Sequence, residues 1–139
     1  MSQSSYVTLV ESSAVQELTM EELGNQLTHY IEQLSRTGEQ LAWDYAGVGF
    51  PFTIQFQKND QGEWIELLGT NSLYSKIYLT IGQETRDQAA YRHIQILLPD
   101  NATHGDKAKA NELCKYFAKT WLAELKLFNG RTMYFNPRK

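Results

Sequence analysis

The segment from Thr103 to Gly130, THGDKAKANELCKYFAKTWLAELKLFNG, constrains this chain most, because it carries the longest helical pattern among the 139 residues. Apolar residues recur in it at steps of three and four, which places them on one stripe of an α-helix. A helix with one apolar stripe and a charged opposite side is typical of a helix that covers a sheet. The stripe consists of Ala110, Leu113, Cys114, Phe117, Trp121, Leu125 and Phe128.

The start of this helix has two interpretations. Thr103, with Asp106 three residues later, resembles a capping box in which Asp replaces the usual Glu or Gln. Gly105 lies inside the first turn and weakens that interpretation, because glycine disfavours helix. The alternative is that Asp106 itself is the capping residue.

The end of the helix also has two interpretations. Asn129-Gly130 can supply the left-handed residue that stops a helix, since glycine carries no Cβ penalty there. Leu125 and Leu127 also alternate with their neighbours, and Asn-Gly between alternating runs is a strong hairpin signal. We favour the helical stop. Both interpretations make Arg131 to Phe135 a final strand.

The first third of the chain predicts a strand, a helix and a second strand. The clearest helix start is Thr19-Met20-Glu21-Glu22, in which the side chains of Thr19 and Glu22 can each accept from the other's amide. Apolar residues repeat after it at helical spacing up to Arg36, and Gly38 is the expected stop. Short β-type runs lie on both sides, at Tyr6 to Val10 and Leu41 to Tyr45.

The middle of the chain predicts four strands joined by short turns. Phe52 to Phe56 alternates at period two, with Phe52, Ile54 and Phe56 on one face. Trp64 to Leu68 returns beside it, and two further runs follow at Leu73 to Ile81 and Tyr91 to Leu98. We therefore predict one α+β domain over residues 1–139, an antiparallel meander sheet with two amphipathic helices packed on one face.

The charge of the chain is unevenly distributed. Residues 1–100 contain 5 Lys or Arg against 13 Asp or Glu, whereas residues 101–139 contain 8 against 3. A basic last helix can simply complement an acidic sheet, or it can face an anionic partner. Nucleic acid is a less favoured partner, because the sequence pI is near 5.6 and proteins that bind nucleic acid specifically usually carry an excess of basic residues. Its candidate contacts are Lys107, Lys109, Lys115, Lys119 and Arg131.

Targeting signals and reactive cysteines are absent from the sequence. No apolar run is long enough to cross a bilayer, and the N-terminus has no signal-peptide pattern. The single cysteine, Cys114, lies on the helical stripe and reads as a core residue. These features predict a cytoplasmic protein without membrane contact.

No pattern of catalytic, nucleotide-binding or metal-binding residues occurs in the chain. His29, His93 and His104 are far apart and lack partners at metal-ligand spacing, so we expect neither metal nor cofactor. The cluster His104-Gly105-Asp106, followed by Lys107, opens the last helix, where free amides favour an anion. Plain helix capping explains the same cluster.

Three stretches of the chain resemble a known family: SSYVTLVESS, LAWDYAGVGFPF and the segment from Asn101 to Lys139. The family consists of small uncharacterised proteins from Bacillus-type bacteria, and the likeness covers nearly the whole chain. The resemblance implies a bacterial cytosolic origin and helices on one face of an antiparallel sheet, similar to half of a TATA-binding protein. It supplies no catalytic residue.

The sequence favours a non-catalytic module that binds a protein, a small molecule or a second copy of itself. Aromatic residues in predicted loops, Phe50 and Tyr74, are typical interface anchors. His104, Asp106 and Lys107 complete the candidate binding residues. The alternative function is an enzyme with a site at His93 or His104, which requires one of these imidazoles to lie in a pocket with a second polar group.

Overall fold

The computed structural model describes residues 3–41, 52–60 and 62–136, with the backbone alone for residues 34–41. The described elements include the predicted first strand, first helix, four-strand run, second helix and final strand, in that order, with an added strand, β6, before the last. They are β1 (Gln3–Thr8), α1 (Met20–Leu41), β2 (Phe52–Asn59), β3 (Gly62–Gly69), β4 (Lys76–Arg86), β5 (Ala89–Leu98), α3 (His104–Trp121), β6 (Glu124–Lys126) and β7 (Thr132–Tyr134).

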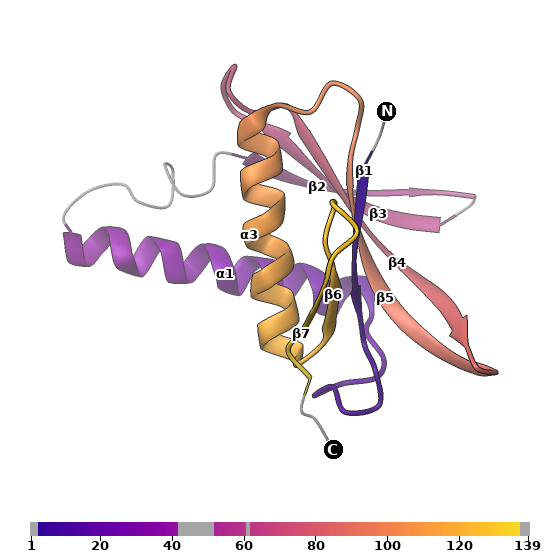
Figure 1. Cartoon of the computed structure of the whole chain (residues 1–139). Helices are drawn as coiled ribbons and strands as arrows, with labels where there is room; N and C mark the ends of the chain where they lie inside the picture. The colour runs from indigo at the N-terminus through magenta and orange to yellow at the C-terminus, as the bar shows by residue number, and fades with distance from the viewer. Residues whose placement is uncertain (1–2, 42–51, 61, 137–139) are drawn as a thin grey trace.

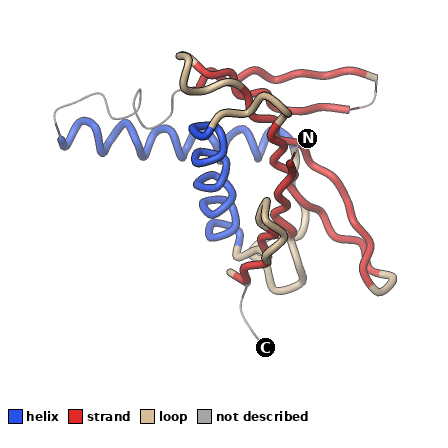
Figure 2. The backbone as a smooth tube through the Cα atoms, turned by 45° about the horizontal axis from the view of Figure 1, so that its top comes forward, coloured by secondary structure: helices blue, strands red, loops and turns tan. Residues whose placement is uncertain are grey.

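The strands form one seven-stranded antiparallel sheet in the order β2-β3-β4-β5-β1-β6-β7. The predicted four-strand meander is therefore confirmed as β2 to β5, each strand beside the next. β1 pairs with the free side of β5, and the last two strands extend the sheet beyond β1. Figures 1 and 2 show that the β2–β3 and β4–β5 pairs project from the body of the molecule in different directions.

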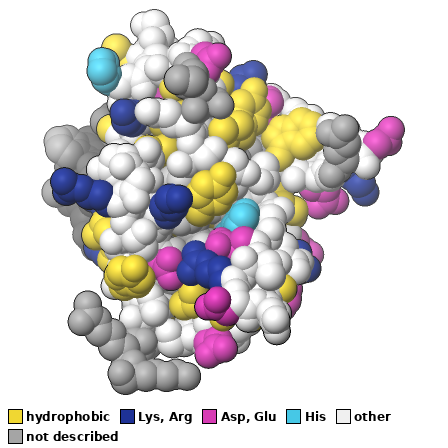
Figure 3. Space-filling view, turned by 45° about the vertical axis from the view of Figure 1, so that its right-hand side comes forward, with side chains coloured by type: hydrophobic (Ala, Val, Ile, Leu, Met, Phe, Trp, Pro, Cys, Tyr) yellow, Lys and Arg dark blue, Asp and Glu magenta, His cyan; other side chains and the backbone are white. Residues whose placement is uncertain are grey.

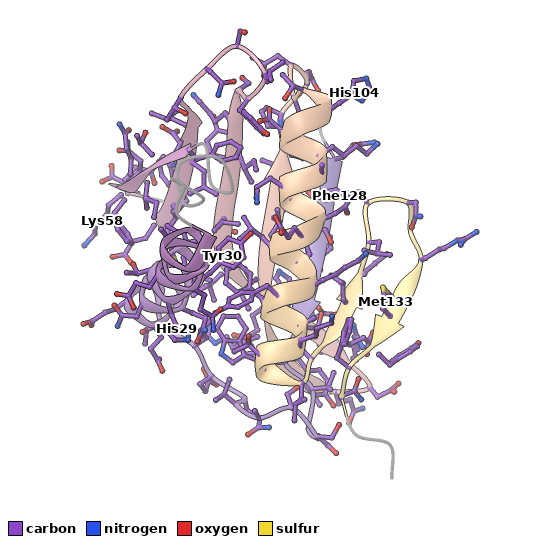
Figure 4. All side chains as sticks on the ribbon, turned by 90° about the vertical axis from the view of Figure 1, so that its left-hand side faces the viewer. His29, Tyr30, Lys58, His104, Phe128 and Met133 are labelled. Atoms are coloured by element: carbon purple, nitrogen blue, oxygen red, sulfur yellow. The ribbon has the colours of Figure 1, made fainter. Side chains whose placement is uncertain are left out.

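Both helices lie on one face of this sheet, as predicted (Figure 4). Alternate strand residues point toward them and are buried, because period-two alternation puts every second side chain on the same face. The sheet contributes Val7, Ile65, Leu67, Ile77, Leu79, Ile94, Ile96 and Leu98 to the core. α3 contributes its predicted stripe as far as Trp121, and α1 contributes Leu23, Leu27 and Tyr30.

The start of α1 is confirmed and its end is not. The Glu22 amide donates to Thr19 Oγ1 at 3.1 Å, and the Thr19 amide donates to Glu22 Oε1 at 3.0 Å. The helix continues past Gly38 to Leu41, so the stop expected at Gly38 is wrong. One glycine costs a helix only about 1 kcal/mol, which the other residues can offset. Of the strand predicted from Leu41 to Tyr45, Leu41 ends α1 and residues 42–45 lie outside the described part.

The end of α3 differs from the predicted end by more residues than the end of α1 does. The helix stops at Trp121, where Leu122 takes a left-handed conformation with φ 51° and ψ 53°. Leu125 then lies in β6 and pairs with Val7, so it reaches the core from a strand rather than from the helical stripe. Asn129-Gly130 falls in the β6–β7 turn. The favoured helical stop is wrong, the hairpin is correct, and the predicted final strand is present as β7.

Candidate functional site

The first predicted site lies at the start of α3, where Thr103 is the capping residue. The Asp106 amide donates to Thr103 Oγ1 at 3.0 Å, and the Thr103 amide donates to Asp106 Oδ2 at 3.0 Å. This is a complete capping box with Asp in the reciprocal position. The alternative in which Asp106 is itself the capping residue is therefore wrong.

The carboxylate of Asp106 also joins α3 to the sheet. It is fully buried, and it accepts from the amide of Ser75 at 2.8 Å and from the amide of Lys76 at 3.3 Å. A buried carboxylate that accepts from several backbone amides is a structural group, because those amides compensate its lost hydration. The arrangement leaves Asp106 no exposed surface for a ligand.

Tyr74 packs at the same junction. Its ring lies edge-to-face on Phe52 with centroids 5.2 Å apart. The backbone of Gly105 is so close that a Cβ there would lie 2.7 Å from Tyr74 Cε1, which explains a glycine in the first turn of the helix. The structure thus brings Tyr74 and Asp106 together as packing partners of one helix start.

The remaining predicted site residues are dispersed. His104 and Lys107 are exposed on α3, and His104 lies at the end of the helix in Figure 4. Phe50 lies outside the described residues. The candidate residues at the helix start therefore do not form one anion site. The carboxylate of Asp106 is buried, whereas the side chains of His104 and Lys107 are exposed.

His93 belongs to a polar network on the sheet face opposite the helices. Its side chain is 13% exposed, and its Nδ1 lies 3.1 Å from Glu84 Oε1. Thr8 Oγ1 donates to the same oxygen at 2.9 Å, while Arg86 donates to Glu84 Oε2 at 2.8 Å and to both oxygens of Glu124 at 3.1 Å. In the view of Figure 3, a histidine lies among acidic and basic side chains near the middle of the surface.

The network stabilises the ionised form of Glu84. Partial burial raises the pKa of its carboxyl, but hydrogen bonds from Arg86, Thr8 and His93 outweigh burial and lower the pKa below its usual value. Both carboxylate oxygens are engaged by protein donors. His93 therefore has, in Glu84, the second polar group that an enzyme site requires. The network to which both belong also links four strands, β1, β4, β5 and β6.

Other chemically reactive groups are few among the described residues. Burial raises the pKa of the Cys114 thiol to about 12, in spite of a hydrogen bond with Ser5 that lowers it. The thiol is therefore protonated near neutral pH and is a poor nucleophile. No group of three or more His, Cys, Asp or Glu side chains in the described residues is placed to hold a metal ion.

A groove of about 590 Å³ lies between the first half of α1 and the β2–β3 pair, and we call it the α1 groove. Gly24 and Phe56 face each other across its floor. A Cβ at Gly24 would lie 2.8 Å from the Phe56 ring, so the glycine lets that ring rest directly on the helix backbone. The other side of the ring is open, and Phe56 is 64% exposed. Met20 and Trp64 also line the groove.

The rim of the α1 groove is polar. Asn25, Thr28 and Gln57 line it with uncharged hydrogen-bonding groups. Lys58 and Glu63 also line it, with 3.8 Å between Lys58 Nζ and Glu63 Oε1, so their charges offset each other. Glu21 also lines the groove and leaves its rim with a net negative charge. An apolar floor inside such a polar rim suits a small molecule better than a polyanion.

Sequence reasoning missed the α1 groove. Alternation placed Phe56 on the same face of the sheet as Phe52 and Ile54, but the ring of Phe56 is 64% exposed, whereas Phe52 is buried. Gly24 was the available signal, since a glycine inside a helical pattern usually has a packing or functional reason. The sequence could not show that the packing partner of Gly24 is Phe56, which lies 32 positions further along the chain.

The fold and the groove define a small α+β domain in which two helices cover one face of an antiparallel sheet. The chain belongs to the DUF1885 family, a domain of unknown function whose sequence model matches residues 3–137. The resemblance to a family of uncharacterised bacterial proteins is thereby confirmed. The chain is also similar to a protein of unknown function from Bacillus stearothermophilus, known from a crystal structure.

That similarity covers 88% of this chain and 93% of the other, with 39% sequence identity and a TM-score of 0.58. A comparison with curated proteins gave no match. Among the described residues, neither helix combines the length and the apolar character that a membrane crossing needs. The comparisons support a bacterial origin and the α+β fold, and they carry no statement of activity.

Proposed function

We propose that this protein is a non-catalytic binding module that holds a small, largely apolar molecule in the α1 groove. The observation that supports this proposal most is the Phe56 ring, which rests on Gly24 and remains 64% exposed inside a groove of about 590 Å³. A soluble domain gains stability by burying such a ring, so a large exposed aromatic side chain in a concave site favours an external ligand.

The size and chemistry of the α1 groove support a small molecule as its ligand. Pockets for small molecules commonly measure roughly 300–1,000 Å³ and combine apolar walls with a few polar groups. Covering the open side of Phe56 would contribute about 1–2 kcal/mol, the exposed share of the value for a whole side chain. Asn25, Thr28 and Gln57 would orient polar atoms of the ligand at the rim.

Two further points belong to this proposal. In the network around His93, both carboxylate oxygens of Glu84 are engaged by Thr8, His93 and Arg86, and the members of the network do not line the α1 groove. We therefore assign no catalytic step to it.

We also propose that the protein is cytoplasmic, since its single cysteine is a buried free thiol.

A fragment screen by NMR tests the proposal. Aromatic fragments should bind the full chain and shift the backbone amide signals of Gly24, Thr28 and Phe56. Phe56→Ala should weaken these fragments by roughly tenfold, because it removes the main apolar wall. Tyr134→Ala is the matched control, since Tyr134 is 61% exposed and does not line the groove. It should leave fragment affinity unchanged.

Two results would refute the proposal. One is a set of fragment hits whose shifts lie outside the α1 groove, or no hits at all. The other is a Phe56→Ala protein that keeps its fold and binds the fragments as tightly as the parent. Signal dispersion in the same spectra establishes whether each variant is folded.

A further inference from the structure

A second groove, of about 370 Å³, lies between α3 and the β6–β7 turn, and we call it the α3 groove. The turn runs beside the helix in Figures 1 and 4, and Phe128, which belongs to the turn, lies next to α3 in Figure 4. None of the residues that line the groove is acidic. They include Gln3, Lys107, Asn111, Lys115, Phe128 and Asn129.

Two lysines give the α3 groove a positive charge that no acid in it offsets. Lys107 and Lys115 are exposed on α3, about 12 Å apart along the helix axis, with Asn111 midway between them. Neither has a carboxylate partner within ion-pair distance in the described part of the chain. Lys109, on the same helix, contrasts with them, because its ammonium pairs with Glu112.

Amide side chains and an apolar wall complete the groove. Gln3 and Asn111 reach it from β1 and α3, and Asn129 reaches it from the turn. The Oδ1 atom of Asn129 accepts from the Arg131 amide at 2.9 Å, so that side chain has its N–H groups left to donate. Phe128 is half-buried and offers a ring face beside these donors.

We propose that the α3 groove binds a small molecule in which a phosphate monoester is attached to a flat apolar group. The phosphate would lie over Asn111, between the ammonium groups of Lys107 and Lys115, with the apolar group against Phe128. A phosphate dianion has several strong acceptor oxygens, which matches donors that arrive from three different elements. This site is independent of the α1 groove.

Nucleic acid fits the α3 groove less well than a small phosphate ester. The whole chain carries a formal net charge of −3, so a long polyanion gains no overall electrostatic attraction from it. The groove is also short, which limits the number of phosphate contacts to a few, whereas nucleic-acid binding depends on many. A single phosphate avoids both costs.

Titration of the full chain with phenyl phosphate, followed by amide chemical shifts at low salt, tests this proposal. The shifts should centre on Lys107, Asn111, Lys115 and Asn129. Phenyl phosphate should bind roughly tenfold more tightly than inorganic phosphate, because only the ester has a ring to place on Phe128. Phenol alone should shift these amides weakly or not at all.

Single substitutions separate the contributions of the two lysines and of Phe128 to the affinity for phenyl phosphate. Lys107→Gln and Lys115→Gln should each weaken phenyl phosphate by about five- to tenfold. Lys119→Gln removes the same charge from α3 outside the groove lining and should change the affinity by less than about twofold. Phe128→Ala should reduce phenyl phosphate to the affinity of inorganic phosphate and leave inorganic phosphate itself unaffected.

Three results would overturn the proposal. Equal, weak binding of phenyl phosphate and inorganic phosphate would indicate an adventitious ion only. A loss of affinity in Lys119→Gln as large as in Lys107→Gln would indicate a diffuse charge effect. Shifts centred on Gly24 and Phe56 would place the ester in the α1 groove instead.

Discussion

Replacement of Asp106 by alanine is the most informative perturbation, because it separates a structural carboxylate from a ligand-binding one. The side chain is fully buried at the junction of α3 and β4. Three backbone amides donate to it, those of Ser75 at 2.8 Å, Thr103 at 3.0 Å and Lys76 at 3.3 Å. Alanine would leave all three without this acceptor.

The expected loss of stability follows from those contacts. Each buried amide left without a partner costs about 1–3 kcal/mol, and the Thr103 amide, which is half of the capping box, accounts for about 0.5–2 kcal/mol of the total. The long contact to Lys76 should count at the lower limit, and water can reach part of the junction. We therefore expect Asp106→Ala to lower the free energy of unfolding by roughly 3–6 kcal/mol, out of about 5–15 kcal/mol for such a domain.

Urea denaturation followed by far-ultraviolet circular dichroism measures this loss. Asp106→Asn should lie between the parent and the alanine variant, since one amide oxygen can still accept while the new NH₂ opposes a donor. Lys107→Ala, at the next position on the exposed side of the helix, should change the free energy of unfolding by less than about 0.5 kcal/mol. Equal slopes of the transitions would establish that the unfolded states are comparable.

One outcome would refute the structural interpretation of Asp106. If Asp106→Ala were within about 1 kcal/mol of the parent, the three amides would not depend on the carboxylate. Asp106 would then return to the set of candidate ligand-binding residues at the helix start. A large loss restored by inorganic phosphate would instead support the structural interpretation, because an external anion would then be replacing the carboxylate as the acceptor for these amides.

Two further perturbations test the packing of α3 and the polar network. Trp121 is 6% exposed and stacks on Phe117 with centroids 5.2 Å apart, so Trp121→Ala should cost roughly 3–5 kcal/mol in the same assay. Lys119→Ala should cost less than about 0.5 kcal/mol, and equal stability of the Trp121→Ala variant and the parent would make Trp121 an interface residue. The lowered pKa of Glu84 means that its contribution to stability is present above the unfolded-state value of 4.5 and is lost as pH falls through the folded-state value. Glu84→Gln should therefore be less stable than the parent at neutral pH and should approach it below pH 4.5, whereas a difference independent of pH would exclude the charge of Glu84 as the cause.

Features that depend on neighbouring residues were predictable from the sequence. The capping box of Thr19 and Glu22 involves atoms three residues apart, and so does the one at Thr103 and Asp106. The four strands of the meander follow from alternation and turns, because each pairs with the next strand in the chain. The α+β class and the helix-covered face follow from these elements.

The end of α3 shows where local pattern fails. Leu125 and Phe128 continue the helical spacing, whereas Leu125 and Leu127 alternate with their neighbours as a strand would. The choice depends on β1, more than a hundred positions earlier, which offers Val7 and Tyr6 as pairing partners for Leu125 and Lys126. No window around the Asn-Gly turn contains that information, so the favoured helix was wrong although both patterns were visible.

The sequence by itself therefore determined the periodic helices, the capping box of Thr19 and Glu22, the meander and the asymmetry of charge. The tertiary structure decided which of those residues are available for binding. It buried Asp106 against Ser75, placed Phe56 on Gly24, and brought the β6–β7 turn beside Lys107 and the rest of the α3 groove. The physical reason is that caps and periodicity arise within a few residues, whereas a groove exists only where two elements distant in the chain meet.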